Sequence, residues 1–291
     1  MKIFKLLITG AILTTVMSSC LKNKFDTINP SGSPSVVEFK NPVPPSSETP
    51  EGSLYTVFPV AYEVGASVEA TYTVQLTGPD PAPQDVSVNI GVKSAAVAEL
   101  NADKSVISSY VPYVELPASL YTITTPTVTI PSGQRTATVK VTYKTANFDF
   151  SKKYALPISI TSSNYAGVSK NFGTVLLNVS AKNAYDGVYT YTTSANTSLV
   201  PNANKTVSLI TVNATTVSLS PGLLGTYTNE VTYTVDPSTN KVTVACPSLG
   251  VQTPQDTRSN WNPATKVMTV FWKQGNGGRT FEETFTYKGV R

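Results

Sequence analysis

The 291-residue sequence contains no histidine. That absence excludes Ser-His-Asp and Cys-His nucleophile systems, histidine general bases and every metal site with an imidazole ligand. Paired carboxylates could still hydrolyse glycosides, but Glu282 and Glu283 are adjacent, so on a strand their side chains point to opposite faces. Asp186, Glu230 and Asp256 are isolated along the chain. We therefore expect a protein that is not an enzyme and needs no cofactor.

Cysteines and charged residues are also few. The two cysteines are Cys20 and Cys246, and if Cys20 carries lipid, Cys246 has no partner within the chain. Cys246 follows the alternating Val242 and Val244, which is typical of a small buried hydrophobe on a strand. Charged residues make up 14% of the chain and the formal net charge is +4, which is too small for a nucleic-acid surface.

Long hydrophobic runs are absent except at the start, where residues 1–20 read MKIFKLLITGAILTTVMSSC. Lys2 and Lys5 precede an apolar stretch that is too short to span a bilayer, and small residues follow it. This pattern predicts a lipoprotein signal peptide at 1–19, with Met17 in place of the leucine usual before the lipidated cysteine. Cys20 would then bear the acyl chains that tether the protein to a membrane. Residues 20–34, polar and rich in Pro and Gly, are expected to form a flexible stalk.

Residues 35–181 show the period-2 alternation of half-buried strands. The clearest expected strands are 36–40, 86–92, 137–143, 156–160 and 175–179. Turn residues such as Pro131-Ser132-Gly133 separate them, and the alanine-rich stretch 95–100 favours one or two helical turns. This spacing predicts an N-terminal antiparallel β-sandwich of immunoglobulin-like type.

Residues 182–291 are expected to form a second β domain. Its expected strands are 188–192, 206–212, 216–219, 230–235, 241–246, 266–272 and 280–288. Consecutive hairpins of this kind would give either a second antiparallel sandwich or a small barrel. The predicted fold class is therefore all-β, with two domains after the signal peptide and stalk.

Several segments resemble a family of bacterial surface proteins. They are 85–88 (DVSV), 116–123 (LPASLYTI), 128–134 (VTIPSGQ), 154–158 (YALPI) and 183–189 (NAYDGVY). Together they resemble the N-terminal domain of unknown function, a β-sandwich, common in surface lipoproteins of gut Bacteroidota. Genes for such lipoproteins often lie beside those for starch-utilisation-type outer-membrane transporters. The resemblance covers roughly residues 36–190, continues more weakly to the C-terminus, and implies no catalytic residue.

This resemblance implies a location and partners. It implies an outer-membrane lipoprotein of a polysaccharide-utilisation system, with the cell surface favoured over the periplasmic face and a transporter complex as a partner. The residues after Cys20 depart from the surface-export pattern, because Lys22 and Lys24 precede the first acid, Asp26. Asp26-Thr27-Ile28 resembles the O-glycosylation motif of this phylum, which makes Thr27 a candidate modification site.

Glycan binding by β domains usually combines a flat aromatic side chain with amides and carboxylates. Trp261 follows a polar loop that contains Asp256, Arg258 and Asn260, and we expect these four residues to form the sugar site. Trp272 alternates with Met268 and Val270 and is expected in the core. The predicted function is a non-catalytic, membrane-anchored lipoprotein that binds or presents a polysaccharide or oligosaccharide. The alternative is a structural or protein-interaction subunit of the cell envelope without glycan affinity.

Overall fold

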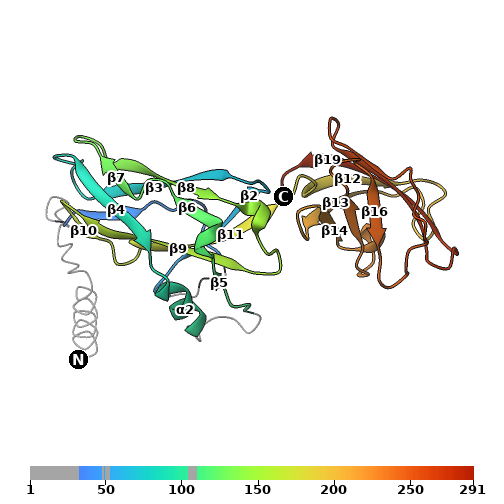
Figure 1. Ribbon diagram of the computed structural model, residues 1–291, viewed down its shortest axis with the longest axis horizontal. Coiled ribbons are helices and arrows are strands. Elements are labelled where there is room, and N and C mark those ends of the chain that lie inside the picture. The colour runs from blue at the N-terminus through green and yellow to red at the C-terminus, as the bar shows by residue number, and fades with distance from the viewer. Residues whose placement is uncertain (1–32, 48, 50–52, 104–109) are drawn as a thin grey trace, which may run out of the picture.

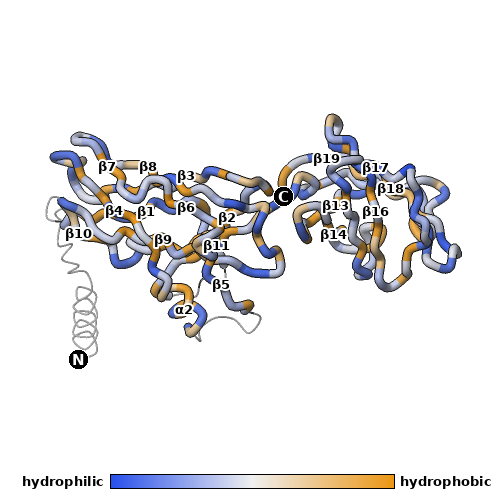
Figure 2. The backbone as a smooth tube through the Cα atoms, in the orientation of Figure 1, coloured by the Kyte–Doolittle hydropathy of each residue, from blue (hydrophilic) through white to orange (hydrophobic). Residues whose placement is uncertain are grey.

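The computed structural model describes residues 33–47, 49, 53–103 and 110–291, and within them the chain is almost entirely β (Figure 1). The chain first forms a sandwich of two sheets and then a single sheet that curls on itself. The sandwich and the curled sheet lie end to end (Figure 1). Hydrophobic and hydrophilic residues alternate along many of the strands (Figure 2). The all-β, two-part fold predicted from the sequence is confirmed.

The first sheet of the sandwich has the order β10-β1-β3-β8-β6. Its strands are β10 (Gly167–Val168), β1 (Val36–Phe39), β3 (Val68–Thr77), β8 (Thr136–Tyr143) and β6 (Tyr121–Ile123). Its centre is the long antiparallel pair β3–β8, in which Val68 faces Tyr143 and Gln75 faces Thr136. Alternate residues such as Val74, Val139 and Val141 are buried, which is why the alternation could be recognised in the sequence.

The second sheet has the order β2-β11-β9-β4-β7, with β5 beside β9. Its strands are β2 (Val57–Glu63), β11 (Thr174–Lys182), β9 (Tyr154–Ser163), β4 (Val86–Val92), β7 (Thr127–Ile130) and β5 (Val114–Glu115). Three pairs of strands in the sandwich are parallel, namely β2 with β11, β1 with β10, and β5 with β9. The other pairs are antiparallel. The helix α2 (Ala95–Ala102) packs Ala96, Val97 and Leu100 beside β9 and β11, in a small cluster outside the main core.

The C-terminal sheet has the order β16-β15-β14-β13-β12-β19-β18-β17, with every pair antiparallel. Its strands are β12 (Gly187–Thr193), β13 (Asn204–Thr211), β14 (Thr216–Ser220), β15 (Thr232–Val235), β16 (Val242–Ala245), β17 (Asn260–Asn262), β18 (Val267–Lys273) and β19 (Thr280–Gly289). The first and last strands of this unit, β12 and β19, are neighbours. Such a meander curls into a barrel when its two edges meet.

The edges of this sheet, β16 and β17, do meet at one point. Lys241 and Asn260 form an isolated antiparallel bridge, and the Trp261 N–H donates to the Asn240 carbonyl at 2.8 Å. The sheet is therefore a near-closed, eight-stranded up-and-down barrel over residues 187–289. Of the two architectures left open by the sequence, the small barrel is the one adopted.

Large side chains fill the barrel. The fully buried aromatic residues are Tyr189, Tyr191, Tyr233, Phe281 and Phe285. Phe285 lies at their centre, with ring centroids 4.9 Å from Tyr191 and 5.1 Å from Tyr233. Cys246 is buried in the same core, which confirms the prediction of a small buried hydrophobe on a strand. Close packing of this kind leaves the outer face and the ends of the barrel as the places where a ligand could bind.

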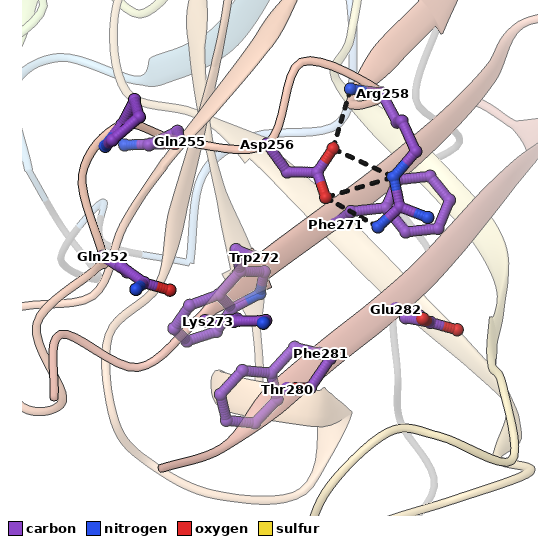
Figure 3. Close-up of a pocket in the computed structure, with 11 residues that line it drawn as sticks. Gln252, Gln255, Asp256, Arg258, Phe271, Trp272, Lys273, Thr280, Phe281 and Glu282 are labelled. Atoms are coloured by element: carbon purple, nitrogen blue, oxygen red, sulfur yellow. Dashed lines mark hydrogen bonds and ion pairs between the residues drawn. The ribbon is translucent and has the colours of Figure 1, made fainter. Parts of the chain in front are cut away.

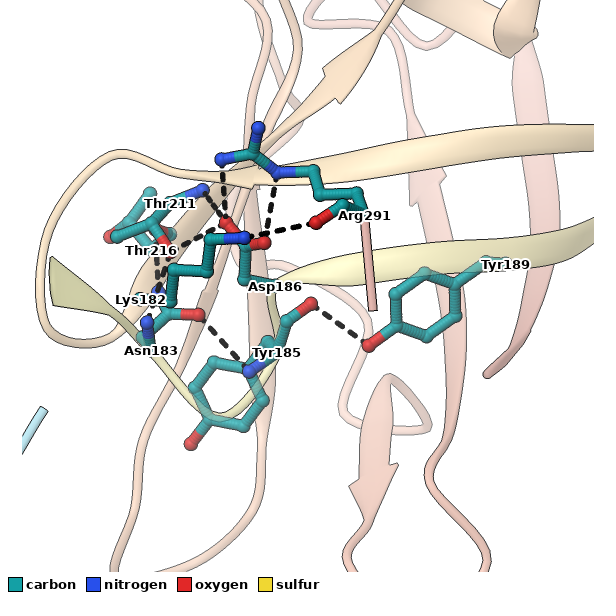
Figure 4. Close-up of polar contacts among 8 residues, drawn as sticks. All are labelled: Lys182, Asn183, Tyr185, Asp186, Tyr189, Thr211, Thr216 and Arg291. Carbon is teal, nitrogen blue, oxygen red and sulfur yellow. Dashed lines mark hydrogen bonds and ion pairs between the residues drawn. The ribbon is translucent and has the colours of Figure 1, made fainter. Parts of the chain in front are cut away.

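A link of four residues joins β11 to β12, and polar contacts fix it to the barrel (Figure 4). The Asn183 side-chain amide donates to the carbonyls of Asn213 and Thr216 at 2.8 and 2.9 Å. The Asp186 carboxylate accepts from the Thr211 N–H at 2.8 Å and from the Arg291 guanidinium at 2.9 Å. Both polar side chains of the link are therefore engaged by the barrel.

Two of the predicted sites, Cys20 and Thr27, lie outside the described residues, as do the predicted signal peptide and most of the stalk. No helix in the described part of the chain combines the length and the apolar character needed to cross a bilayer.

Candidate functional site

A pocket of about 210 Å³ lies between β18, β19 and residues 247–259, which belong to the connection from β16 to β17 (Figure 3). Its lining residues are Gln252, Pro254, Gln255, Asp256, Arg258, Phe271, Trp272, Lys273, Thr280, Phe281 and Glu282. The strand register sets Phe271 opposite Glu282 and Lys273 opposite Thr280. These alternate residues face outward, while Trp272 and Phe281 between them face the barrel interior.

The base of the pocket is aromatic. The Trp272 and Phe281 rings are stacked with centroids 4.0 Å apart, and both side chains are buried. Burial of Trp272 confirms the prediction that it belongs to the core. The Phe271 ring lies on the outer side of the same strand and is half-buried. The pocket therefore has an apolar base with little exposed ring surface.

An ion pair forms one wall of the pocket (Figure 3). The Arg258 guanidinium donates to both oxygens of the Asp256 carboxylate, with N–O distances between 2.6 and 3.1 Å. Its carbon lies 4.1 Å from the centroid of the Phe271 ring, so the guanidinium also covers that ring face. The hydrogen bonds from Arg258 hold the pKa of Asp256 below its ordinary value, and the charge on Lys273 acts in the same direction. Asp256 is accordingly a carboxylate at neutral pH.

β19 and its neighbours contribute further polar groups to the pocket lining. The Glu282 carboxylate accepts from the Ser194 hydroxyl at 2.5 Å, and the Glu282 carbonyl accepts from the Thr197 hydroxyl at 2.9 Å. These contacts join the connection between β12 and β13 to the pocket. Among the described residues, the side chains of Gln252 and Lys273 form no hydrogen bond or ion pair, and both are exposed. They are the groups most available to a ligand.

The side chain of Gln255 fixes the 247–259 connection to the barrel. Its amide nitrogen donates to the Val244 carbonyl at 2.9 Å, and its oxygen accepts from the Val244 N–H at 2.8 Å. Sequence reasoning did not single out Gln255, because nothing in its local pattern indicates a contact with a strand eleven residues earlier. Its neighbour Asp256 owes its place in the pocket to this anchor.

The structure brings together two of the four predicted glycan-binding residues, Asp256 and Arg258. Asn260 is exposed on β17 and does not line the pocket. The expectation of an exposed Trp261 ring is wrong, because its side chain is 4% exposed and packs edge-on against Tyr185 in the barrel core. The physical reason is strand alternation: Asn260 and Asn262 face outward, so Trp261 between them faces inward. The alternation over Asn260, Trp261 and Asn262 was the sequence signal that could have assigned the Trp261 ring to the core.

Sequence reasoning gave Glu283 no specific role, yet it is the most unusual residue of the barrel. Its side chain faces inward, opposite to Glu282 as predicted, and is 1% exposed. It accepts hydrogen bonds from Tyr191 at 2.7 Å, from Tyr233 at 3.0 Å and from the Trp272 indole at 2.9 Å. Burial raises the pKa of Glu283, and these hydrogen bonds oppose that change. Because every donor points at one carboxylate, the network holds Trp272 under the pocket.

Two family models match separate parts of the chain. Residues 187–289, the barrel, match the family model of a domain of unknown function, DUF7015. Residues 48–167, in the sandwich, match a family model described as an N-terminal domain. No curated protein shows a significant sequence match to the chain.

Solved structures with a similar fold come from Bacteroides. A Bacteroides ovatus protein of unknown function has a TM-score of 0.56 at 13% identity, covering 88% of this chain and 95% of its own. A Bacteroides ovatus multidomain protein including DUF1735 has a TM-score of 0.51 at 17% identity, covering 86% and 92%. An auxiliary nutrient binding protein from Bacteroides thetaiotaomicron is less similar, with a TM-score of 0.44 at 15% identity and coverage of 79% and 89%. At such identities the first two likenesses show that this chain shares its fold with these two Bacteroides proteins, and nothing beyond the fold.

Proposed function

We propose that this protein is a non-catalytic carbohydrate-binding lipoprotein of the outer membrane, and that the barrel pocket is its sugar site. The observation that carries the proposal is the composition of that pocket. The half-buried Phe271 and the buried Trp272 and Phe281 lie beneath a rim of amide, carboxylate, guanidinium and ammonium groups. Sugars present a ring of hydroxyls, so a small pocket surrounded by several hydrogen-bonding side chains suits them.

The arrangement of the chain fits presentation of a ligand away from a membrane. If Cys20 is lipidated, the tether enters the sandwich at β1, which pairs with β10. β10 lies at the end of the sandwich away from the barrel (Figure 1). The sandwich would then act as a spacer, and the barrel would face the polysaccharide that a neighbouring transporter takes up.

The test is affinity gel electrophoresis of the exported chain in gels that contain soluble polysaccharides. A double variant, Gln252→Ala with Arg258→Ala, removes two exposed hydrogen-bonding side chains of the pocket. Loss of hydrogen bonds to a bound ligand should weaken retention by about tenfold or more. The matched control, Gln134→Ala with Arg135→Ala, removes the same side chains from an exposed turn of the sandwich and should leave retention unchanged.

Two results would contradict the proposal. If the wild-type chain is retained by no polysaccharide, carbohydrate binding is wrong. If the pocket variant folds and is retained as well as the wild type, the pocket is not the site. Both tryptophans of the chain, Trp261 and Trp272, lie in the barrel core, so tryptophan fluorescence reports whether the barrel is folded.

A protein-interaction role is the second candidate, and one surface of the sandwich favours it. Leu54 is 73% exposed and lies beside Val168 in a shallow depression of about 350 Å³. An exposed leucine in a depression suits a protein contact better than a sugar. Leu54→Glu should then abolish co-purification with an outer-membrane transporter and leave polysaccharide retention unchanged.

A further inference from the structure

The pocket also indicates which kind of sugar it takes. We propose that it binds a single sugar unit that carries a carboxylate, as uronic acids do, and that the Lys273 ammonium contacts that carboxylate. This inference rests on the proposed carbohydrate function and narrows it to one ligand class. Pocket size, the pairing of its charges and the placement of Lys273 each support it.

The first argument is size. Sites for drug-sized ligands typically measure about 300–1,000 Å³, and this pocket measures about 210 Å³. The Asp256–Arg258 ion pair and Glu282 on β19 are among the groups that line it. A space of this size admits one pyranose ring, so the unit bound would be a chain end, a side branch or a free monosaccharide.

The second argument is the pairing of charges within the pocket. Asp256 has both oxygens engaged by Arg258, and Glu282 accepts a short hydrogen bond from Ser194. Lys273 is the charged lining residue for which the described part of the chain provides no hydrogen bond or ion pair. A ligand that enters this pocket therefore meets one cation ready to form a charge-assisted hydrogen bond. A negatively charged hydrogen-bond acceptor is the best partner for the Lys273 ammonium.

The third argument is placement. The Lys273 backbone is held on both sides, by its pairing with Thr280 on β19 and by the hydrogen bond from the Gln252 N–H to its carbonyl at 2.9 Å. The Lys273 side chain thus projects from a fixed point at the end of β18, in a pocket that Gln252 and Thr280 also line. An amide and a hydroxyl next to a cation can bond the ring hydroxyls that neighbour a sugar carboxylate.

The experiment is isothermal titration of the exported chain with matched sugars. The probes are methyl glucuronide against methyl glucoside, methyl galacturonide against methyl galactoside, and tetragalacturonate. We expect at least one acidic sugar to bind about tenfold or more tightly than its neutral partner, and to weaken in high salt. Binding of tetragalacturonate should stay within about threefold of the monomer, because the pocket holds one unit.

Variants assign the effect to one side chain. Lys273→Met keeps the aliphatic stem and should reduce the preference for the acidic sugar to near one. The matched control is Lys288→Met. Lys288 lies at the other end of β19 and contacts Thr206, so this variant should retain the preference for the acidic sugar. An unchanged preference in Lys273→Met, equal binding of acidic and neutral sugars, or a gain of tenfold with the tetramer would each overturn the inference. If only neutral sugars bind, this inference fails and the proposed function stands; if no sugar binds, both fail.

Discussion

The side-chain amide of Gln255 pairs with the backbone N–H and carbonyl of Val244, at 2.8 and 2.9 Å, in the place where a neighbouring strand would lie. Lys241, just before β16, forms a bridge with Asn260 on β17, and beyond Val242 the two segments separate, which leaves the edge of β16 open at Val244. An open edge is both a source of instability and a template for association with another chain. Gln255 satisfies that edge and at the same time ties the pocket wall to the barrel.

Replacement of Gln255 should therefore loosen the barrel seam. Gln255→Leu removes both hydrogen bonds and should lower the free energy of unfolding by about 1–3 kcal/mol, because each net hydrogen bond contributes about 0.5–1.5 kcal/mol. Hydrogen exchange at the Val244 amide should become faster, which a mass-spectrometric or NMR measurement would detect. Gln255→Glu should restore only the bond from the Val244 N–H, since a carboxylate cannot donate to the carbonyl.

Gln252→Leu is the matched control for this prediction. Gln252 lies in the same connection, but its side chain forms no hydrogen bond among the described residues. Exchange at Val244 in this control should remain at the wild-type rate. Equal exchange at Val244 in Gln255→Leu and wild type would show that the pairing does not protect the edge.

Trp261 is expected to matter for stability and to have no direct contact with a ligand. Its ring lies in the barrel core, 5.2 Å between centroids from Tyr185, so Trp261→Ala leaves a large cavity. The expected loss of unfolding free energy is about 3–5 kcal/mol. Thermal unfolding followed by Trp272 fluorescence would measure it. A variant with wild-type stability and lost sugar binding would instead restore Trp261 as a binding residue.

The contrast between the two tryptophans shows how far sequence patterns reach. Alternation over a full strand identified β4 at its observed ends and placed Trp272 in the core, because period 2 assigns each side chain to a face. Trp261 lies on a strand of only three residues, where the alternation is too short to outweigh its polar neighbours. The polar residues around Trp261 therefore outweighed the alternation, and the prediction that its ring is exposed was wrong.

Contacts between distant residues were beyond such patterns. The sequence placed Glu282 and Glu283 on opposite faces, yet the hydrogen bond from Tyr191 to Glu283 joins residues that are 92 positions apart. Similarly, Gln255 contacts a strand edge that exists only because the barrel nearly closes. Alternation determines which side chains face inward, whereas the pairing of strands determines which of them meet. The pocket therefore emerged only from the three-dimensional structure.

The proposed membrane anchor gives a prediction that is independent of the barrel. Cys20→Ala removes the thiol that would carry the acyl chains, which are the strongest membrane-binding groups expected of a lipoprotein. The variant should appear in the soluble fraction or remain unprocessed, while the wild type sediments with membranes after a carbonate wash. Immunoblotting of the two fractions provides the measurement. Continued sedimentation of the variant would show that another element holds the protein at the membrane.

Glu283 should make barrel stability depend on pH. Burial raises its pKa above the ordinary 4.5, so between that value and the raised pKa the folded state binds a proton that the unfolded state releases. The stabilisation is therefore complete below pH 4.5 and is lost as the pH rises through the folded-state pKa. Each tenfold difference in proton affinity corresponds to about 1.4 kcal/mol.

The measurement is urea unfolding of the barrel, followed by tryptophan fluorescence across the pH range from 4 to 9. Glu283→Gln is the matched variant, because an amide resembles the neutral carboxyl group in shape and cannot ionise. The unfolding free energy of the wild type should fall relative to that of Glu283→Gln as the pH rises, since only the wild type must bury a charge among Tyr191, Tyr233 and Trp272. A difference that stays constant, or that moves in favour of the wild type at high pH, would mean that the three donors stabilise the carboxylate more than burial destabilises it.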